Sequence, residues 1–385
     1  MDTIGMLLMI LFWGAMLLVV YTYAGYPILL RVLSRLFPRP VKEGELAPVL
    51  SVVIAACNEE KNIAARLDNL LAQEYPADRF LVVVVSDGST DRTNEIVSSY
   101  APRVLLLPLT ERVGKAAALN FGVAAATGEL VVFADARQSF APDALARLAE
   151  SFSDPAVGCA SGELMLIDPQ SGAAVAEMGL YWRYEKAIRK MESASGSVVG
   201  ATGAIYAIRR ELYRPLPQGT ILDDVFTPMS VSLQGYRVVF AAGARAYDRL
   251  SENLDQEWAR KVRTLAGNLQ LLELSPSLAV PGKSPLWWRF LSHKIFRLLV
   301  PFALLAMLGI SLLLAARGGL YLALFAAQLL FYLAAVAGYL VPAARGMRLV
   351  KLATFFSVMN CAALMGCWVW ASGRCSTAWR PAYAK

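Results

Sequence analysis

The sequence predicts an α/β protein with a doubly wound sheet, flanked on both sides by segments that could cross a membrane. Between about residues 48 and 160, short apolar runs alternate with helical patterns, which is typical of successive β-α-β units. Outside this region long stretches contain no charged residue. The hydrophobic content of the whole chain is 57%, which is more than an ordinary soluble protein has.

The strands and helices of the expected sheet follow one another along the chain. Residues 50–56 form a continuous apolar run, typical of a buried parallel strand, and Asn58 is expected to cap the next helix. The remaining elements are strands at 80–85, 104–107 and 130–134, a helix opened by Asp91, and a helix over 116–126. Ligands bind at the carboxyl ends of such strands, so the polar residues that follow the strands are expected to form the site.

Residues 162–248 resemble the second half of the same domain, which is therefore expected over 48–250. They include a helical stretch at 182–191 and a segment of small residues at 200–203. After them, residues 253–272 predict a helix with one apolar side and basic residues toward the other. Such a helix suits the membrane interface, within an interface region over 251–297.

Four uncharged stretches are long enough to cross a bilayer, which takes roughly 20 apolar residues. They lie between Asp2 and Arg31, Arg297 and Arg317, Arg317 and Arg345, and Lys351 and Arg374. We therefore expect one transmembrane helix within residues 1–30, three within 298–373, and a tail over 374–385.

Basic residues gather at the ends of these stretches, at 31–42, 283–297 and 345–351. By the positive-inside rule they predict a multi-pass protein of the inner membrane, with the domain between the first two spans in the cytoplasm. Arg374, Arg380 and Lys385 disagree, because a fourth crossing would place them outside. The last segment is thus left open between a crossing and a partly re-entrant path.

Charge and composition also exclude some functions. The net charge of +7 does not indicate a nucleic-acid partner, because lipid headgroups account for the basic residues at the membrane edges. The single histidine, His293, argues against a Ser-His nucleophile or a His-rich zinc site. No Gly-x-Gly-x-x-Gly follows the first strand, which argues against a nicotinamide dehydrogenase.

Two motifs predict a site for a nucleotide diphosphate. In the turn that starts at Asp87, a carboxylate could accept from a base N–H, although an ordinary Asx turn uses the same residue types. Lys115 follows Gly114 at a helix start, where the ammonium group and the helix N-terminus both attract phosphate. A Gly-Lys pair by itself is common.

Three further groups complete the chemistry. Asp135 ends a strand, where one carboxylate with diphosphate oxygens and waters can hold Mg²⁺ or Mn²⁺, unless it simply pairs with Arg137. Asp223 and Asp224 precede a helical stretch; N-capping explains one of them, and the second is the better candidate for a general base. Arg260 and Arg263 lie one helical turn apart and could grip a leaving diphosphate or reach lipid phosphates.

In this order and at these separations, the motifs resemble the membrane-embedded, processive-type family 2 glycosyltransferases with a GT-A fold. That family includes chitooligosaccharide, hyaluronan, cellulose and poly-N-acetylglucosamine synthases. The likeness runs from the segment 51–60 to the last span, and one span before the domain with three after it looks most like chitooligosaccharide synthases. It implies a GT-A-type doubly wound mixed sheet and inverting transfer from a UDP-sugar.

The resemblance also implies roles for single residues on the donor side. Ala55, Glu59 and Asp87 look like nucleoside contacts, with Asp87 reading the uracil. Lys115 resembles the lysine near the donor, and Asp135 resembles the first aspartate of the Asp-x-Asp motif that binds Mg²⁺ or Mn²⁺.

On the acceptor side, Asp224 resembles the catalytic base of the family's Thr-Glu-Asp, with Asp223 at the glutamate. Arg263 resembles the arginine of Gln-x-x-Arg-Trp, with Arg260 beside it as a further donor contact. The segment resembling the family's acceptor-side segment consists of Gly200, Ala201, Thr202 and Gly203.

Two departures from the family pattern matter. Arg137 replaces the second aspartate of Asp-x-Asp, so a metal would lose one ligand. Three consequences stay open: Arg137 holds phosphate directly, the activity depends less on a metal, or the activity is lost. Arg260 and Thr264 stand where glutamine and tryptophan would flank Arg263. In the family that tryptophan stacks beneath the acceptor sugar.

The predicted function is transfer of a sugar from a UDP-sugar to a growing, β-linked extracellular polysaccharide, which would be secreted through the membrane helices. The expected partners are the UDP-sugar, a carbohydrate or lipid-linked acceptor, and membrane lipids. One alternative is a single transfer onto a lipid or polyprenyl carrier. Another alternative is a catalytically degenerate subunit that binds nucleotide as part of a synthase complex. Arg137 is the residue that is consistent with this alternative. The sugar, the linkage and the oligomeric state are not set by the sequence.

Overall fold

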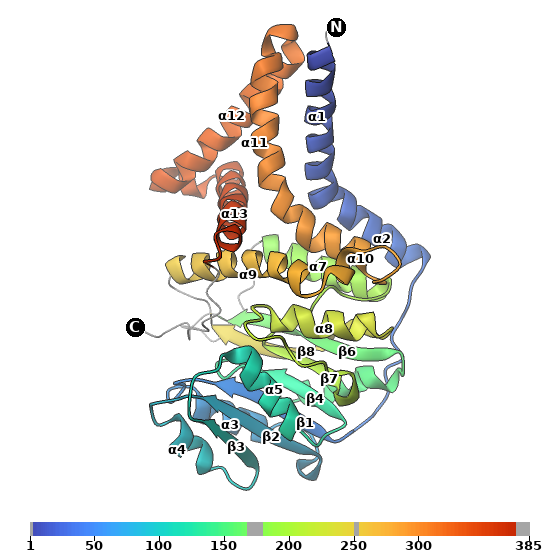
Figure 1. Ribbon diagram of the computed structural model, residues 1–385, viewed down its shortest axis with the longest axis vertical. Coiled ribbons are helices and arrows are strands. Elements are labelled where there is room, and N and C mark those ends of the chain that lie inside the picture. The colour runs from blue at the N-terminus through green and yellow to red at the C-terminus, as the bar shows by residue number, and fades with distance from the viewer. Residues whose placement is uncertain (1–2, 168–179, 250–253, 375–385) are drawn as a thin grey trace. The chain divides into compact units, whose positions relative to one another are not determined.

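A computed structural model describes residues 3–167, 180–249 and 254–374. The chain divides into two compact units (Figure 1), which we call the sheet unit and the helical unit. The sheet unit comprises residues 30–256 and 270–287, and the helical unit comprises residues 1–29, 257–269 and 288–375. Apart from Arg374, the predicted tail lies outside the described residues.

The sheet unit contains one mixed sheet with the strand order β3-β2-β1-β4-β7-β6-β8-β5. The first four strands pair in parallel, β7 is antiparallel to both of its neighbours, and β6 is parallel to β8. Their bounds are β1 Leu50–Ala56, β2 Phe80–Asp87, β3 Val104–Leu109, β4 Leu130–Ala134, β5 Ser139–Phe140, β6 Val157–Ile167, β7 Ile205–Arg209 and β8 Arg237–Arg249. The predicted GT-A-type mixed sheet is confirmed.

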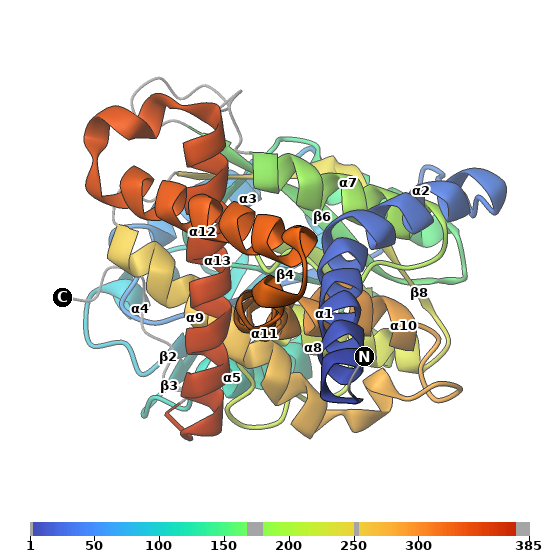
Figure 2. The same ribbon diagram turned by 90° about the horizontal axis from the view of Figure 1, so that it is seen from above.

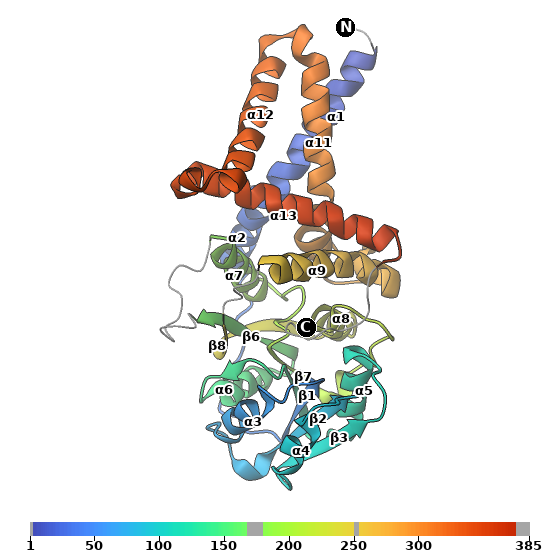
Figure 3. The same ribbon diagram turned by 90° about the vertical axis from the view of Figure 1, so that its left-hand side faces the viewer.

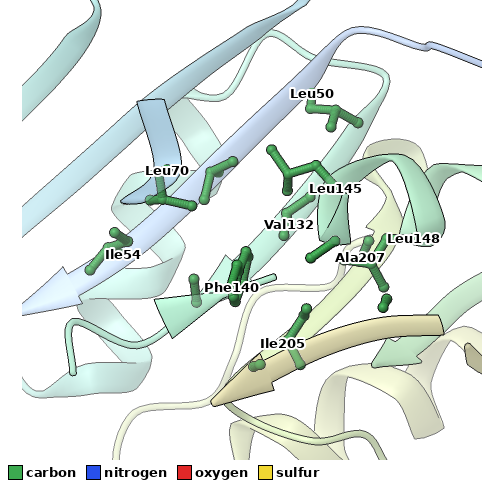
Figure 4. Close-up of a cluster of buried hydrophobic side chains, with 14 of the residues drawn as sticks. Leu50, Ile54, Leu70, Val132, Phe140, Leu145, Leu148, Ile205 and Ala207 are labelled. Atoms are coloured by element: carbon green, nitrogen blue, oxygen red, sulfur yellow. The ribbon is translucent and has the colours of Figure 1, made fainter. Parts of the chain in front are cut away.

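Helices cover both faces of this sheet (Figure 3). On one face α3 and α6 enclose a core of aliphatic side chains from β1, β4 and β7 (Figure 4). On the other face α5 and α8 enclose a second core. The helices of the unit are α3 Ile63–Leu71, α4 Thr93–Ser98, α5 Lys115–Ala125, α6 Ala144–Glu150, α7 Leu180–Ala194 and α8 Asp223–Leu233. Because both faces are covered, the strands β1 and β4 are buried along their whole length, as continuous apolar runs predict.

The prediction that Asn58 caps the helix after β1 is wrong. That helix begins at Ile63, and Asn58 instead adopts a left-handed backbone conformation, with φ of 55°. Its side-chain oxygen accepts a hydrogen bond from the backbone N–H of Thr90 at 2.8 Å. Asparagine tolerates this conformation, so the residue ties the loop after β1 to the loop after β2.

Among the described residues, four helical segments are long and apolar enough to cross a membrane, one near the N-terminus and three in the C-terminal part, as predicted. The segments are Thr3–Leu36, Trp287–Arg317, Gly319–Leu340 and Arg348–Ala371. They contain α1 Thr3–Val20, α2 Tyr26–Leu36, α10 Trp287–Phe290, α11 Phe296–Leu314, α12 Gly319–Leu340 and α13 Arg348–Ala371, and the preceding helix is α9 Leu254–Leu274.

Within the helical unit, α13 does not run along the other long helices. Figures 2 and 3 show it crossing the direction of α11 and α12. It packs closely on α9 at Gly366, where an added Cβ would lie 3.0 Å from Leu265 Cβ and 3.1 Å from the backbone nitrogen of Ala266. The absence of a side chain at this position therefore lets the two helix backbones approach each other.

Candidate active site

The polar residues singled out in the sequence gather at the carboxyl ends of β1, β2 and β4, which are neighbours in the sheet. Glu59 follows β1, Asp87 ends β2 and Asp135 follows β4. Parallel strands bring their carboxyl ends to the same edge, which explains how residues far apart in the sequence meet there.

Asp87 is fully buried and holds the segment that leads into α5. Its two carboxylate oxygens accept hydrogen bonds from the backbone N–H groups of Val113, at 2.7 Å, and Gly114, at 3.0 Å. Gly88 lets the two loops touch, because its φ is +62° and an added Cβ would lie 2.8 Å from the backbone nitrogen of Arg112. Sequence reasoning missed this positioning role, and the contact between Asp87 and uracil stays a prediction.

Lys115 is the first residue of α5 and the centre of the charged cluster. Its Nζ lies 3.0 Å from Asp135 Oδ1 and 3.4 Å from Asp223 Oδ2, and its side chain is only 17% exposed. Burial opposes the charge of the ammonium group, but Asp135, Asp223 and Asp224 outweigh this effect and raise the pKa of Lys115. One cation therefore joins the aspartate after β4 to the aspartate pair of α8.

The two aspartates at the start of α8 differ in their surroundings. Asp223 is buried and ion-paired with Lys115. Asp224 is half-buried, and its Oδ2 lies against Gly203, where an added Cβ would come within 3.0 Å of it. Both carboxylates sit in the first helical turn, where the helix dipole stabilises negative charge. Asp224 is thus the carboxylate that faces the segment predicted to bind the acceptor.

The segment 200–203 is fixed by hydrogen bonds rather than by charge pairs. The N–H of Ala201 donates to the carbonyl of Asp224 at 2.7 Å, and the N–H of Thr202 donates to Ser161 Oγ at 2.9 Å. Arg189 of α7 donates from Nη1 to Thr202 Oγ1 at 2.7 Å. Sequence reasoning missed Arg189, because a basic residue on a partly exposed helix gives no signal by itself.

Arg137 forms an ion pair with Asp248 of β8, and Gln138 Nε2 donates to the same Asp248 oxygen at 3.1 Å. Asp248 is 6% exposed. Asp135, in turn, accepts from Lys115. Sequence reasoning missed Asp248, which lies 111 residues after Arg137 and comes close to it only because β5 pairs with β8.

The donor atoms near Asp135 do not fit the predicted Mg²⁺ or Mn²⁺ site. In the part of the chain that the structure describes, no group of three or more His, Cys, Asp or Glu residues is placed to hold a metal ion. Asp135 is bonded to the ammonium of Lys115, and the position of the family's second carboxylate carries the cation Arg137. A metal prefers several oxygen ligands, whereas the two Asp-x-Asp positions offer one carboxylate, which is already paired with Lys115, and one cation.

The other predicted donor contacts differ in accessibility. The side chain of Ala55 is buried in the core, 3% exposed, so a nucleoside contact there would have to use its backbone. Glu59 is half-buried and accepts from Asn62 at 2.7 Å; burial, with a smaller contribution from Asp135, raises its pKa despite Asn62 and Arg137. Arg260 and Arg263 belong to α9 in the helical unit, and their contact with a diphosphate stays a prediction.

Comparison with known proteins fits this arrangement. The model of the family "Glycosyl transferase family 2" matches residues 51–216. A poly-beta-1,6-N-acetyl-D-glucosamine synthase of Staphylococcus aureus is 24% identical over 229 residues, which is 58% of this chain and 55% of the relative. A probable glycosyltransferase of Bacillus subtilis is 26% identical over 238 residues, covering 57% of this chain and 55% of that protein. The chain thus matches about half the length of these relatives.

Among solved structures, a mannosyltransferase from Pyrobaculum calidifontis, in complex with GDP-mannose and Mn²⁺, has a similar fold. The TM-score is 0.72 at 24% identity, and the match covers 94% of this chain and 99% of the mannosyltransferase. The matched family region contains β1, β2 and β4, whose ends carry Glu59, Asp87 and Asp135. Residues 51–216 thus match a glycosyltransferase domain of family 2.

Proposed function

We propose that this protein transfers a sugar from a UDP-sugar to an acceptor hydroxyl, with inversion at the anomeric carbon. The observation that carries the proposal is the position of Lys115 between Asp135 and Asp223, next to Asp224. A cation at that point lies within reach of a donor diphosphate bound at the strand ends. It is also close to a carboxylate that could act as a base.

In this mechanism Asp224 takes the proton of the acceptor hydroxyl as its oxygen attacks the anomeric carbon. The bond from the anomeric carbon to the diphosphate breaks on the opposite face, and UDP leaves with the bonding electrons. Lys115 meets the negative charge that develops on the leaving group. Asp223 keeps Lys115 in place through their ion pair, and Asp87 does so through the backbone of residues 113 and 114.

A bound Mg²⁺ or Mn²⁺ would neutralise diphosphate charge in such a reaction, and the structurally similar mannosyltransferase contains Mn²⁺. For the present chain the metal stays a prediction. Because the residues around Asp135 do not fit a metal site, we assign no step of the mechanism to a metal ion.

For the product we propose a β-linked polysaccharide, as the name of the Staphylococcus aureus relative suggests, with the long apolar helices as a path to the outside. A second candidate is a single transfer onto a lipid carrier. Two observations favour the second candidate. Arg189, a cation, contacts the acceptor-side segment, and Thr264 stands where the resemblance implies the sugar-stacking tryptophan.

For the topology we propose a sheet unit in the cytoplasm and an in-plane path for α13. The transverse direction of α13 and its contact with α9 support this path. It would keep Arg374 in the cytoplasm, in agreement with the positive-inside rule.

The test of this topology is Ser372→Cys in a background without native cysteines, labelled in intact cells with a membrane-impermeant maleimide. Labelling only after permeabilisation is expected, and labelling of intact cells would exclude this path.

The activity itself is tested by nucleoside diphosphate release from the detergent-purified full-length protein. UDP-N-acetylglucosamine, UDP-glucose, UDP-galactose, UDP-glucuronate and GDP-mannose are offered with membrane lipids, and the product is sized. We expect UDP release with one donor, at a rate that is lower by about a hundredfold or more in Asp224→Asn. Release of GDP alone would exclude the UDP-sugar, and no release from any donor would exclude an autonomous transferase.

A further inference from the structure

The charged residues around Asp135 point to a specific way of holding the donor, which deepens the function proposed above and rests on it. We infer that the diphosphate is bound by two protein cations, Lys115 and Arg137, instead of by a metal on a carboxylate pair, and that Asp248 positions Arg137 for this task. Asp248 is thus a positioning residue that does not itself touch the donor.

The first support is the ion pair between Arg137 and Asp248. Arg137 follows the end of β4 by three residues, and its side chain is 22% exposed, whereas that of Asp248 is 6% exposed. A buried carboxylate holds a guanidinium in one orientation, and a guanidinium has five N–H donors, which is more than a single carboxylate can take up. Gln138 donates to the same oxygen of Asp248, which fixes the carboxylate in turn.

The second support is that the loop carrying Arg137 is also anchored from α3. Asn69 accepts from the N–H of Phe140 at 2.7 Å and donates to its carbonyl at 2.9 Å. The ring of Phe140 lies in the core (Figure 4), and the guanidinium carbon of Arg66 lies 3.9 Å from its centroid. The short segment from Asp135 to Phe140 is therefore held on the β8 side by Asp248 and on the α3 side by Asn69.

The third support is the amount of positive charge near Asp135. Besides Lys115 and Arg137, the buried Arg66 acts on it: burial lowers the pKa of Arg66, and the negative charge of Asp135 raises it. Nε and Nη2 of Arg66 have no hydrogen-bond partner among the described residues. Keeping a buried guanidinium without full pairing is costly, and the charge of Asp135 offsets part of that cost.

These cations can neutralise and orient a diphosphate, as a divalent metal ion does. A fixed guanidinium makes charge-assisted hydrogen bonds to phosphate oxygens, often two at once, and lysine adds a point charge. Groups that are already in place need no reorganisation as charge develops on the leaving group. A carboxylate at position 137 would bind a metal ion, and that ion would supply the positive charge. The guanidinium of Arg137 supplies positive charge directly.

The test is calorimetric binding of UDP and of uridine to the full-length protein, in EDTA and in Mn²⁺. Uridine lacks the diphosphate, so it reports on the nucleoside part of the site alone. The variants are Arg137→Gln, Asp248→Asn and the double variant, which leaves no buried charge unpaired. Arg147→Gln is the control, because Arg147 is an exposed arginine that pairs with Asp143 and Glu150.

We expect the unchanged protein to bind UDP in EDTA within about tenfold of its affinity in Mn²⁺. In EDTA, each of the three variants should weaken UDP binding by roughly tenfold or more and leave uridine binding unchanged. A purely structural role of Asp248 would weaken both ligands alike and would overturn its assignment. The control should bind both ligands as the unchanged protein does.

Two other outcomes separate this inference from the proposed function. Binding of UDP only in Mn²⁺ would overturn the inference and leave the transferase intact. If UDP binds neither with nor without metal, the proposed function fails and the inference fails with it. A double variant that binds UDP in EDTA as well as the unchanged protein would also overturn the inference.

Discussion

The proposed donor side and the proposed acceptor side of the site are built from different interactions. On the donor side, the residues are held by ion pairs: Lys115 pairs with Asp135 and Asp223, and Arg137 pairs with Asp248. On the acceptor side, the segment 200–203 is held by backbone and hydroxyl hydrogen bonds. A diphosphate carries fixed negative charge, so its site benefits from charges set in advance. An acceptor hydroxyl is neutral, so its site has to supply position and a base.

The largest effect is expected from Asp224→Asn, which removes the proposed base from the acceptor side. The rate of sugar transfer should fall by about 10²–10⁴-fold, because general bases contribute on that scale. UDP affinity should change little, since the donor contacts remain. Steady-state kinetics together with UDP calorimetry check both parts. A variant whose transfer rate stays within about tenfold of that of the unchanged protein would show that Asp224 is not the base. The acceptor side would then not be the source of the base.

Next comes Lys115→Gln, which removes the cation that joins the two sides. Asp135 and Asp223 would then lack their shared partner, and breaking such a poorly exposed ion pair should lower the free energy of unfolding by about 3 kcal/mol. UDP binding should weaken as well. Urea unfolding and calorimetry measure the two effects, with the exposed Lys61→Gln as the control. Unchanged stability would mean that the cluster is not held by Lys115.

A smaller effect, confined to the acceptor side, is expected from Gly203→Ala. The added Cβ would lie 3.0 Å from Asp224 Oδ2, tighter than an ordinary contact, so the carboxylate has to shift. The turnover rate should fall by about tenfold, the size of an effect on base placement, while UDP affinity stays the same. Gly243→Ala is the matched control, because its nearest neighbour would be Arg147 Cδ at 3.4 Å. A loss of UDP affinity in Gly203→Ala would show that the two sides are coupled.

The smallest effect is expected from Glu59→Gln, as a change in the dependence of stability on pH. Burial raises the pKa of Glu59 above 4.5, so the folded protein binds this proton more tightly than the unfolded chain does. The contribution of Glu59 to the free energy of unfolding is therefore fully present below pH 4.5 and is lost as the pH rises through the raised pKa of the folded state. Glu59→Gln should flatten this slope in urea unfolding at a series of pH values. An unchanged slope would mean that other groups cause it.

The sequence predicted the strands best and the pairing of charges least. Residues 50–56 and 130–134 form β1 and β4 as predicted. A short, continuous apolar run bounded by polar turns is typical of a buried strand. The turn after β1 went wrong at Asn58, since asparagine is favoured both in caps and in left-handed turns.

The partners of the charged residues could not be predicted from spacing. Whether Arg137 pairs with Asp135 or with a distant carboxylate depends on the pairing of β5 with β8, a tertiary contact. In the same way, Asp87 has the residue type of a ligand contact, but its burial and its two backbone donors emerge only when the loop before α5 folds over it. Local patterns determine which chemical groups are available, and the packing of the sheet determines which of them meet.

The ion pair between Arg137 and Asp248 constrains how such a site could evolve. Changing Arg137 alone to aspartate would place two carboxylates against each other where one of them is almost fully buried. Changing Asp248 alone would leave the guanidinium without its anchor. A lineage passing between a protein-cation site and a two-carboxylate metal site would therefore have to cross an impaired intermediate, and the two kinds of site are separated by a coupled double substitution.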